Sequence, residues 1–86
     1  MNELTDLTDV HMFKTEKDAQ NVLNDLIQIG ELFGVVRQSI FLDMMRIEPK
    51  PIDYKYGWLE HMIKKSRVVA TELGFFIEFP RSVPLE

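Results

Sequence analysis

The stretch from Thr15 to Val36, TEKDAQNVLNDLIQIGELFGVV, decides the fold of this 86-residue chain. Its apolar side chains recur at intervals of three and four residues, which is the period of an amphipathic helix. The sequence therefore predicts a helix with an apolar stripe that faces a core. This stripe contains Ala19, Val22, Leu23, Leu26, Ile27 and Phe33.

Both ends of this predicted helix carry sequence signals. Thr15 and Asp18 have the spacing of a capping box, with Asp in place of the usual Glu, and Glu16 adds a second acid to the first turn. Gly34 follows the last apolar position and is a typical residue after a helix C-terminus. The β-branched pair at 35–36 then predicts a short strand.

A second apolar block covers residues 40–47 and follows Ser39, whose hydroxyl is a suitable helix N-cap. Since few of its residues are charged, we expect a helix that is buried on most sides. A strand through Phe41 is the competing interpretation. The segment EPKP at 48–51 predicts a loop, because each proline lacks a backbone donor and restricts the residue before it.

A third apolar block begins at Trp58, keeps helical spacing as far as Gly74, and predicts a third helix. A terminal strand over 75–79 is expected after it. The alternative is a β-hairpin in which residues 66–71 pair with 75–79 about a turn at 72–74. The longer run of helical spacing favours the helix.

Length and composition indicate one small domain. A chain of 86 residues that is 45% hydrophobic can bury one core and is too short for two. We expect a mobile arm over 1–13, one α+β domain over 14–84, and the remnant of a purification tag at 85–86. The order of elements resembles a small winged helix, with three helices and a short sheet of two or three strands.

The charge is distributed unevenly. Residues 1–33 hold two Lys against seven acids, whereas 34–86 hold eight basic residues against seven acids. Nucleic acid, if it is bound, must therefore contact the second part, because phosphate binding needs a cationic face. No apolar run could span a bilayer, and the acidic start is unlike a signal peptide, so we expect a soluble, cytoplasmic protein.

A basic group near the third block is the candidate nucleic-acid site. On a long helix His61, Lys64 and Lys65 would share one face, with Arg67 beside it, and this face could enter a major groove. The competing interpretation is a solvated face, partly neutralised by Glu60 four residues before Lys64.

An aromatic cluster, Tyr54, Tyr56 and Trp58, lies beside the proline-containing loop and is the candidate protein-binding site. Aromatic side chains contribute strongly to protein interfaces, although a Trp here could equally anchor the protein's own core. Catalysis is not expected. The chain has no Cys, its two His lie far apart, and no glycine cluster indicates a nucleotide loop, so neither a cofactor nor a metal is predicted.

Several short motifs are similar to those of small uncharacterised proteins encoded by tailed bacteriophages and prophages. This resemblance spans residues 13–85 and implies a phage or prophage source and a bacterial cytoplasm, but no particular activity. The motifs are Phe13-x4-Asp18-Ala19, Val22-Leu23-Asn24-Asp25-Leu26-Ile27, Phe33-Gly34-Val35-Val36, Leu42-Asp43, Lys55-Tyr56-Gly57-Trp58 and Gly74-Phe75-x-Ile77-x-Phe79-Pro80.

Together these features predict a phage or prophage accessory protein that binds another protein, from the host or the phage, without catalysis. One alternative is a winged-helix DNA-binding regulator that uses the third helix. A second alternative is a small structural or assembly protein of the virion. The composition is compatible with a monomer or a small oligomer.

Overall fold

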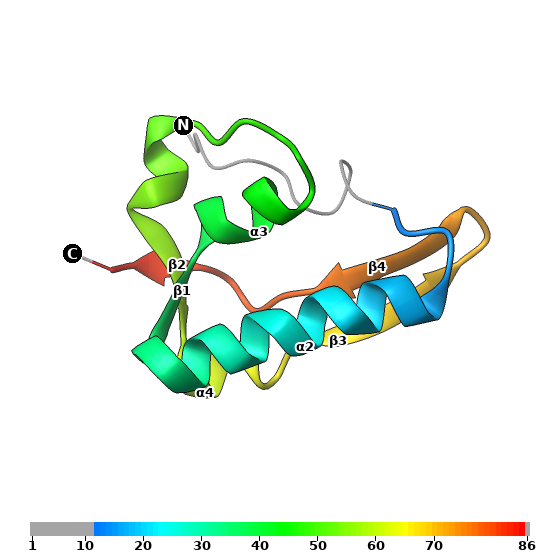
Figure 1. Ribbon diagram of the computed structural model, residues 1–86, viewed down its shortest axis with the longest axis horizontal. Helices are drawn as coiled ribbons and strands as arrows, with labels where there is room; N and C mark the ends of the chain where they lie inside the picture. The colour runs from blue at the N-terminus through cyan, green and yellow to red at the C-terminus, as the bar shows by residue number, and fades with distance from the viewer. Residues whose placement is uncertain (1–11, 86) are drawn as a thin grey trace.

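The computed structural model describes residues 12–85, which form a small α+β domain with three α-helices and two small antiparallel sheets (Figure 1). The predicted α+β class is confirmed. Residues 1–11 of the predicted N-terminal arm lie outside the described residues. The last residue of that segment, Phe13, is buried and exchanges two backbone hydrogen bonds with Phe75.

The long helix α2 (Glu16–Phe33) begins and ends where the sequence predicts. Thr15 Oγ1 accepts a hydrogen bond from the N–H of Asp18 at 3.1 Å. At the other end Gly34 has φ +81°, a left-handed conformation that glycine adopts without steric penalty. The N–H of Gly34 donates to the carbonyl of Gly30 at 2.7 Å and closes the last turn.

One face of α2 lines the core. Its fully buried residues follow the helical period and are Ala19, Leu23, Leu26 and Gly30. Gly30 marks a close approach, since a Cβ there would lie 3.1 Å from Cγ2 of Ile63. The prediction that Phe33 belongs to the buried stripe is wrong. This side chain is 73% exposed, because the core ends one turn before the helix does.

The short strand β1 (Val35–Arg37) runs directly into helix α3 (Gln38–Met44). The sequence predicts both elements, but it places the helix over 40–47, so both ends of the helix differ. Ser39 is not the N-cap. The cap position is the extended residue Arg37, whose own side chain makes no capping hydrogen bond. Because β1 leads into α3 without a turn, Ser39 falls inside the first helical turn and is buried.

The predicted loop after α3 contains a short 3-10 helix, η1 (Pro51–Tyr54), which is tied to α3 by a buried carboxylate. Asp53 is fully buried and accepts hydrogen bonds from Nε2 of Gln38 at 2.6 Å and from the N–H of Lys50 at 2.8 Å. These bonds hold the loop against the helix.

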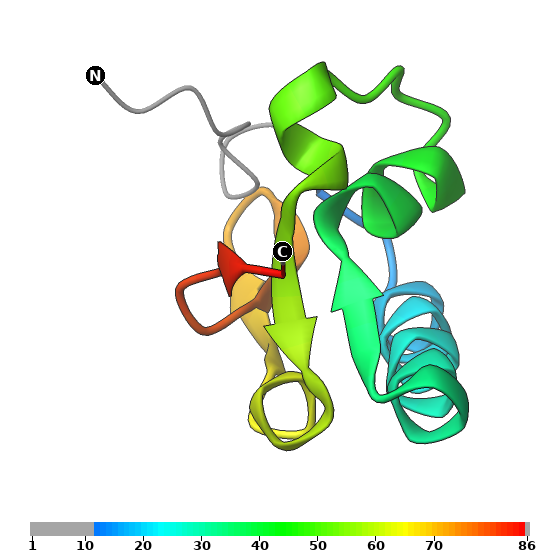
Figure 2. The ribbon, with the colours of Figure 1, turned by 90° about the vertical axis from the view of Figure 1, so that its left-hand side faces the viewer.

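Strand β2 (Tyr56–Leu59) lies between β1 and β5 (Val83–Pro84) in an antiparallel three-stranded sheet. Figure 2 shows β1 and β2 side by side, with β5 beyond β2 and α2 beyond β1. Gly57 pairs with both neighbouring strands. A Cβ at this position would collide with the carbonyl oxygen of Val36 and lie 2.8 Å from Cα of Arg37, so only glycine fits.

The prediction of a long third helix is wrong, and the alternative hairpin is confirmed. Helix α4 (Glu60–Ile63) is a single turn, and β3 (Arg67–Thr71) then pairs with β4 (Gly74–Glu78). Three of the five residues in β3 are β-branched, a composition that strands favour. Gly74, the predicted end of that helix, instead has φ +140° after the two-residue turn.

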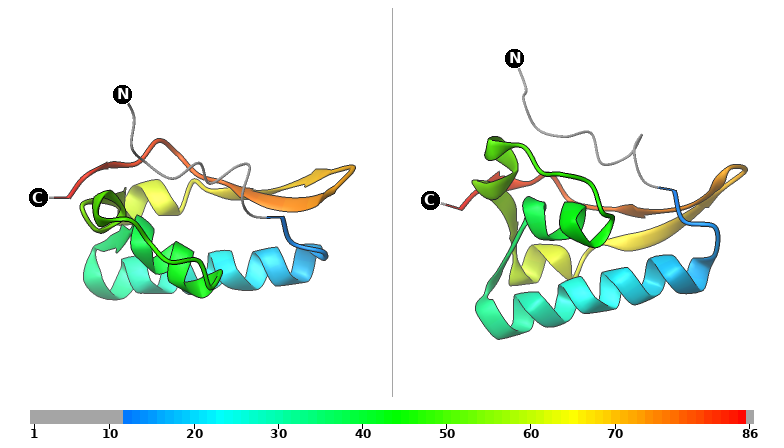
Figure 3. Two further views of the ribbon diagram at one scale, coloured as in Figure 1. Left: turned by 90° about the horizontal axis from the view of Figure 1, so that it is seen from above. Right: turned by 45° about the horizontal axis from the view of Figure 1, so that its top comes forward.

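The hairpin β3–β4 forms a layer beside α2, as the two views of Figure 3 show. The segment that follows the hairpin packs against Trp58 of β2, and this contact links the two sheets. The Trp58 and Phe79 rings stack with centroids 4.5 Å apart, and Phe79 also meets Phe41 edge to face at 4.9 Å. Nε1–H of Trp58 donates to the carbonyl of Pro80 at 2.7 Å. One core therefore serves both sheets.

Candidate functional site

The three residues of the predicted aromatic cluster differ in burial: one lies in the core and two lie at the surface. Trp58 is only 1% exposed and its indole N–H is already bonded, so the structure places it in the core. Tyr54 is half exposed, and Tyr56 is partly exposed. Trp58 therefore has no free surface to offer a partner, and only the two tyrosines remain available for contact.

The predicted basic group does not lie on one helix face. Lys64 follows the single turn of α4, and its Nζ contacts Glu60 at 2.9 Å and Glu31 at 3.3 Å. Arg67 begins β3, where its Nε contacts Glu78 at 2.8 Å. Two of the four cations are therefore neutralised within the protein, and the expected groove-reading helix is replaced by one turn and a strand.

The two acids change the titration of Lys64. The hydrogen bond to Glu60 is the largest cause that raises the pKa of this ammonium above its ordinary value, and the hydrogen bond to Glu31 is the next. Lys64 is charged throughout the neutral range, as an ordinary lysine is, and the raised pKa extends the charged form to higher pH. The ion pairs with α2 and α4 consequently persist at physiological pH, although surface pairs of this kind contribute little to stability.

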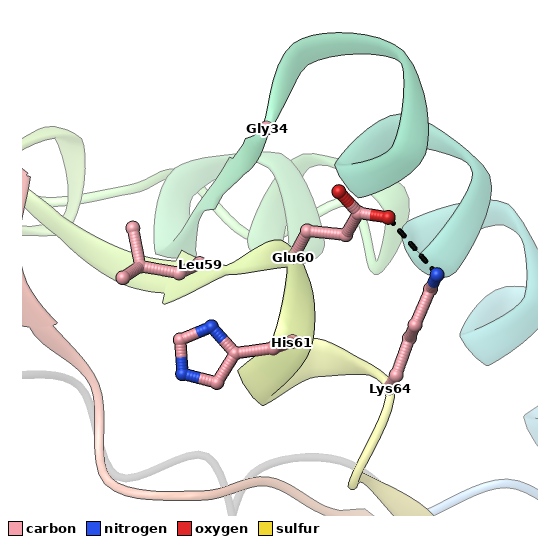
Figure 4. A pocket seen from close by; sticks show the side chains of 5 residues that line it. All are labelled: Gly34, Leu59, Glu60, His61 and Lys64. Carbon is pink, nitrogen blue, oxygen red and sulfur yellow. Dashed lines mark hydrogen bonds and ion pairs between the residues drawn. The ribbon is translucent and has the colours of Figure 1, made fainter.

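A shallow, open hollow of about 490 Å³ lies where α2 ends and α4 begins. Its lining consists of Gly34, Leu59, Glu60, His61 and Lys64. Figure 4 shows Glu60 and Lys64 joined on the side of α2, whereas Leu59 and His61 point to the other side of the β2–α4 junction. Two of the predicted cations, His61 and Lys64, thus meet at this hollow.

Backbone contacts fix this hollow. The N–H of Glu60 donates to the carbonyl of Gly34 at 3.0 Å, and the adjacent residues Val35 and Leu59 are partners in the β1–β2 ladder. The left-handed turn at Gly34 is what returns the chain from α2 into β1 at this point. The end of α2, the start of β1 and the β2–α4 junction therefore form one rigid corner.

Large apolar side chains stand exposed around this corner. Leu32 is 68% exposed, Phe33 is 73% exposed and Leu59 is 39% exposed. We call these three residues the apolar end. The first two precede the turn at Gly34 directly, and Leu59 pairs with the residue that follows it. Leu59 therefore lines the hollow itself, and Leu32 and Phe33 lie in the last turn of α2, just before the lining residue Gly34.

Sequence reasoning missed the apolar end because it assigned Phe33 to the core. The spacing offered no signal for Phe33. It follows Gly30 by three residues and Leu26 by seven, so it keeps the period of the buried stripe, whereas Leu32 falls on the opposite side of the helix. Phe33 is exposed because the core ends before the last turn of α2.

The side chains at the corner are few and of mixed chemical character. The corner offers one imidazole, a carboxylate already paired with an ammonium, and apolar side chains. Within residues 12–85 no group of three or more His, Cys, Asp or Glu side chains is arranged to hold a metal ion. No helix in the same part of the chain has the length and apolar character needed to cross a membrane.

Comparisons with protein-family models, with curated proteins and with solved structures found nothing that matches this chain. Its function must therefore be inferred from its own residues and their geometry.

Proposed function

We propose that this protein is a non-catalytic binding module that docks another protein on its apolar end. The observation that carries the proposal is the exposure of Leu32 and Phe33, at 68% and 73%, beside an open hollow on a corner fixed by backbone hydrogen bonds. Exposed apolar side chains that gather at one place mark interaction sites more reliably than scattered ones.

The geometry of the corner favours binding of a protein over binding of a small polar ligand. Burying the three side chains of the apolar end would remove apolar area from water, and Phe is a residue type that contributes strongly to interfaces. Because the turn at Gly34 holds the corner in place, little ordering is needed when a partner binds. The partner would cover the apolar end with apolar side chains and would place polar groups at the hollow, whose lining includes Glu60, His61 and Lys64.

The resemblance to proteins of tailed bacteriophages and prophages supports a phage or prophage accessory protein that acts in the bacterial cytoplasm. Under this proposal the partner is a protein of the host or of the phage. A second surface, formed by Tyr54 and Tyr56 next to η1, competes with the apolar end for the same role.

Two further alternatives have weaker support. A winged-helix regulator would use the hairpin β3–β4 as its wing, but α4 is one turn long and Lys64 and Arg67 are paired with acids. A structural or assembly role in the virion would be indicated by a ring of several subunits. Each alternative predicts an observation that protein docking on the apolar end does not.

The test is co-purification from the native host, followed by identification of the partner and a binding measurement with purified proteins. Leu32→Ser combined with Phe33→Ser should abolish capture without unfolding the domain, because both side chains lie outside the core. Leu73→Ser is the matched control, since Leu73 is 84% exposed at the other end of the molecule. Capture that the double variant retains would refute the proposed surface.

The same experiment separates the alternatives. Loss of capture with Tyr54→Ala and Tyr56→Ala, but not with the double serine variant, would move the site to η1 and β2. Binding of duplex DNA at low salt, with a salt slope that falls by about two units in Lys64→Ala with Lys65→Ala, would favour the regulator. Rings larger than a dimer would favour the virion protein.

A further inference from the structure

The outer edge of the hairpin β3–β4 carries backbone groups that have no backbone partner within residues 12–85. Phe75 in β4 exchanges hydrogen bonds with Phe13, at 2.7 and 2.9 Å, so its N–H and C=O point away from β3. In an antiparallel ladder, two directly opposite residues either both point their N–H and C=O groups at each other or both point them away. Ala70, which is opposite Phe75, therefore points its N–H and C=O away from β4, and so does Val68 two residues before it.

The two edges of the hairpin therefore differ in their backbone hydrogen bonding. The Phe13 segment bridges the β4 edge at Phe75, whereas no backbone hydrogen bond in the described part of the chain reaches the β3 edge. Ala70 and Arg67 are exposed. Natural proteins commonly block such an edge with a bulge, a proline or an inward-pointing charge, and β3 has the regular register of an unblocked strand.

The face of the hairpin turned away from α2 also has apolar character. Ile77 is buried against the core, so the alternate residues of the ladder face outward. Val69 and Phe76 are cross-strand partners on that outward face and are partly exposed. An isolated two-stranded ribbon is marginal, and additional strands would extend this apolar surface into a broader sheet.

We propose that the β3 edge is a dimer interface, at which a second copy of this chain adds its own β3 in antiparallel orientation. A two-fold axis at Val69 would place Val69 opposite its equivalent and Val68 opposite Ala70 of the second copy. The outward N–H and C=O groups of Val68 and Ala70 then meet each other in the pattern of a hydrogen-bonded antiparallel pair. The result is a four-stranded sheet with a closed, symmetric interface.

The charges of β3 favour the antiparallel direction. Arg67 begins β3 and is paired with Glu78 of its own chain. Antiparallel pairing about Val69 sets Arg67 opposite Thr71 of the second copy, so no like charges face each other across the new pair. Parallel pairing would bring like charges together, which is unfavourable across strands. The charges of the strand are therefore compatible with self-pairing in only one direction.

This interface is independent of the proposed docking surface. Figure 1 places the hairpin tip and the C-terminal end of α2 at opposite ends of the long axis, in a molecule about 36 Å long. A dimer formed through β3 would leave both apolar ends exposed and would present two docking surfaces to a partner. Failure of either proposal leaves the other standing.

The test measures the mass in solution as a function of concentration, by light scattering and native mass spectrometry. We expect an equilibrium between the 10.1 kDa chain and a species of twice that mass. Ala70→Pro should weaken dimerisation at least tenfold, because it removes an outward N–H and leaves the β3–β4 ladder intact. Ala70→Ser retains the N–H and should dimerise as the natural chain does.

Two measurements do not depend on the folding of the proline variant. The amides of Val68 and Ala70 should gain protection from hydrogen exchange as concentration rises, whereas the amide of Val69, bonded to β4, should be protected throughout. Val69→Arg should weaken the dimer several-fold, because it sets like charges opposite each other at the two-fold axis, and Val69→Thr should not.

A chain that is monomeric at all concentrations would overturn the proposal. So would a dimer that is equally strong in folded Ala70→Pro, or one that the double serine variant of the apolar end dissociates instead.

Discussion

At the residue scale, Gly57 has the least space for a side chain among the four glycines. This residue lies in the central strand β2 and pairs with β1 on one side and β5 on the other. A Cβ there cannot be accommodated, because its two nearest obstacles are backbone atoms of Val36 and Arg37, although the third, Cδ1 of Leu85, belongs to a side chain. The requirement is steric, whereas Gly34 is required for its left-handed conformation.

These two glycines give a matched prediction. We expect Gly57→Ala to destabilise the protein by on the order of 3 kcal/mol, at the upper end of the usual range for overpacking. Gly34→Ala has open space around its Cβ and should cost only about 1–2 kcal/mol, the strain of placing alanine in a left-handed conformation. Chemical denaturation of both variants measures the difference. A larger loss at Gly34 would contradict the steric argument.

The buried carboxylate of Asp53 gives a second prediction at this scale. Asp53→Ala leaves Nε2 of Gln38 and the N–H of Lys50 without this acceptor, and we expect a loss of about 2–4 kcal/mol from unsatisfied buried donors. In the double variant with Gln38→Met the loss should be smaller than the sum of the two single losses, because one orphaned donor is gone. Strictly additive losses in a double-mutant cycle would show that the two side chains act separately.

At the element scale, the sequence predicts local structure well where the period is unambiguous. The limits of α2 follow from Thr15 and Gly34, and both caps involve the expected residues. The helix prediction fails after Trp58. Helical spacing is satisfied by Ser66, Val69, Ala70 and Leu73, although this stretch forms a strand and its turn. The choice between them depends on pairing with 74–78, which is not visible in a local window.

The candidate site could be predicted only in part, for a related reason. Sequence spacing assigns His61 and Lys64 to one basic face, and both do line the hollow. The acids that neutralise Lys64 come from two different elements, and only Glu60 lies at a helical spacing. The exposure of Phe33 depends on where the core stops, which is a property of the packed molecule rather than of the helix.

A prediction for α2 separates its two apolar regions. Leu26→Ala should cost about 2–5 kcal/mol, because Leu26 is fully buried and the change leaves a cavity. Leu32→Ala, in the last turn of the same helix, should change stability by no more than about 0.5 kcal/mol, as is usual for exposed positions. Thermal melts of the two variants provide the comparison. Equal losses would mean that the last turn is packed in solution.

At the scale of the whole molecule, the two sheets share no strand and are joined through side chains. Trp58 belongs to the three-stranded sheet, and it contacts Phe79 and Pro80 in the segment that leaves the hairpin. Phe41 of α3 reaches the same Phe79 ring. The helix α2 contacts strands of both sheets. We therefore expect the domain to unfold in one cooperative step rather than sheet by sheet.

Trp58 reports on that cooperativity because it is the only Trp in the chain. Its emission should be blue-shifted in the folded protein, since the indole is 1% exposed, and the unfolding curve followed by this emission should coincide with the curve followed by far-UV circular dichroism.

Trp58→Ala should cost about 3–5 kcal/mol through the cavity it leaves. Trp58→Phe keeps a ring against Phe79 but removes the donor to the carbonyl of Pro80, and should cost about 1–3 kcal/mol. If Trp58 were instead a docking residue, its emission would be that of an exposed indole and Trp58→Ala would leave stability unchanged. Two separate transitions would show that the indole contacts do not couple the sheets.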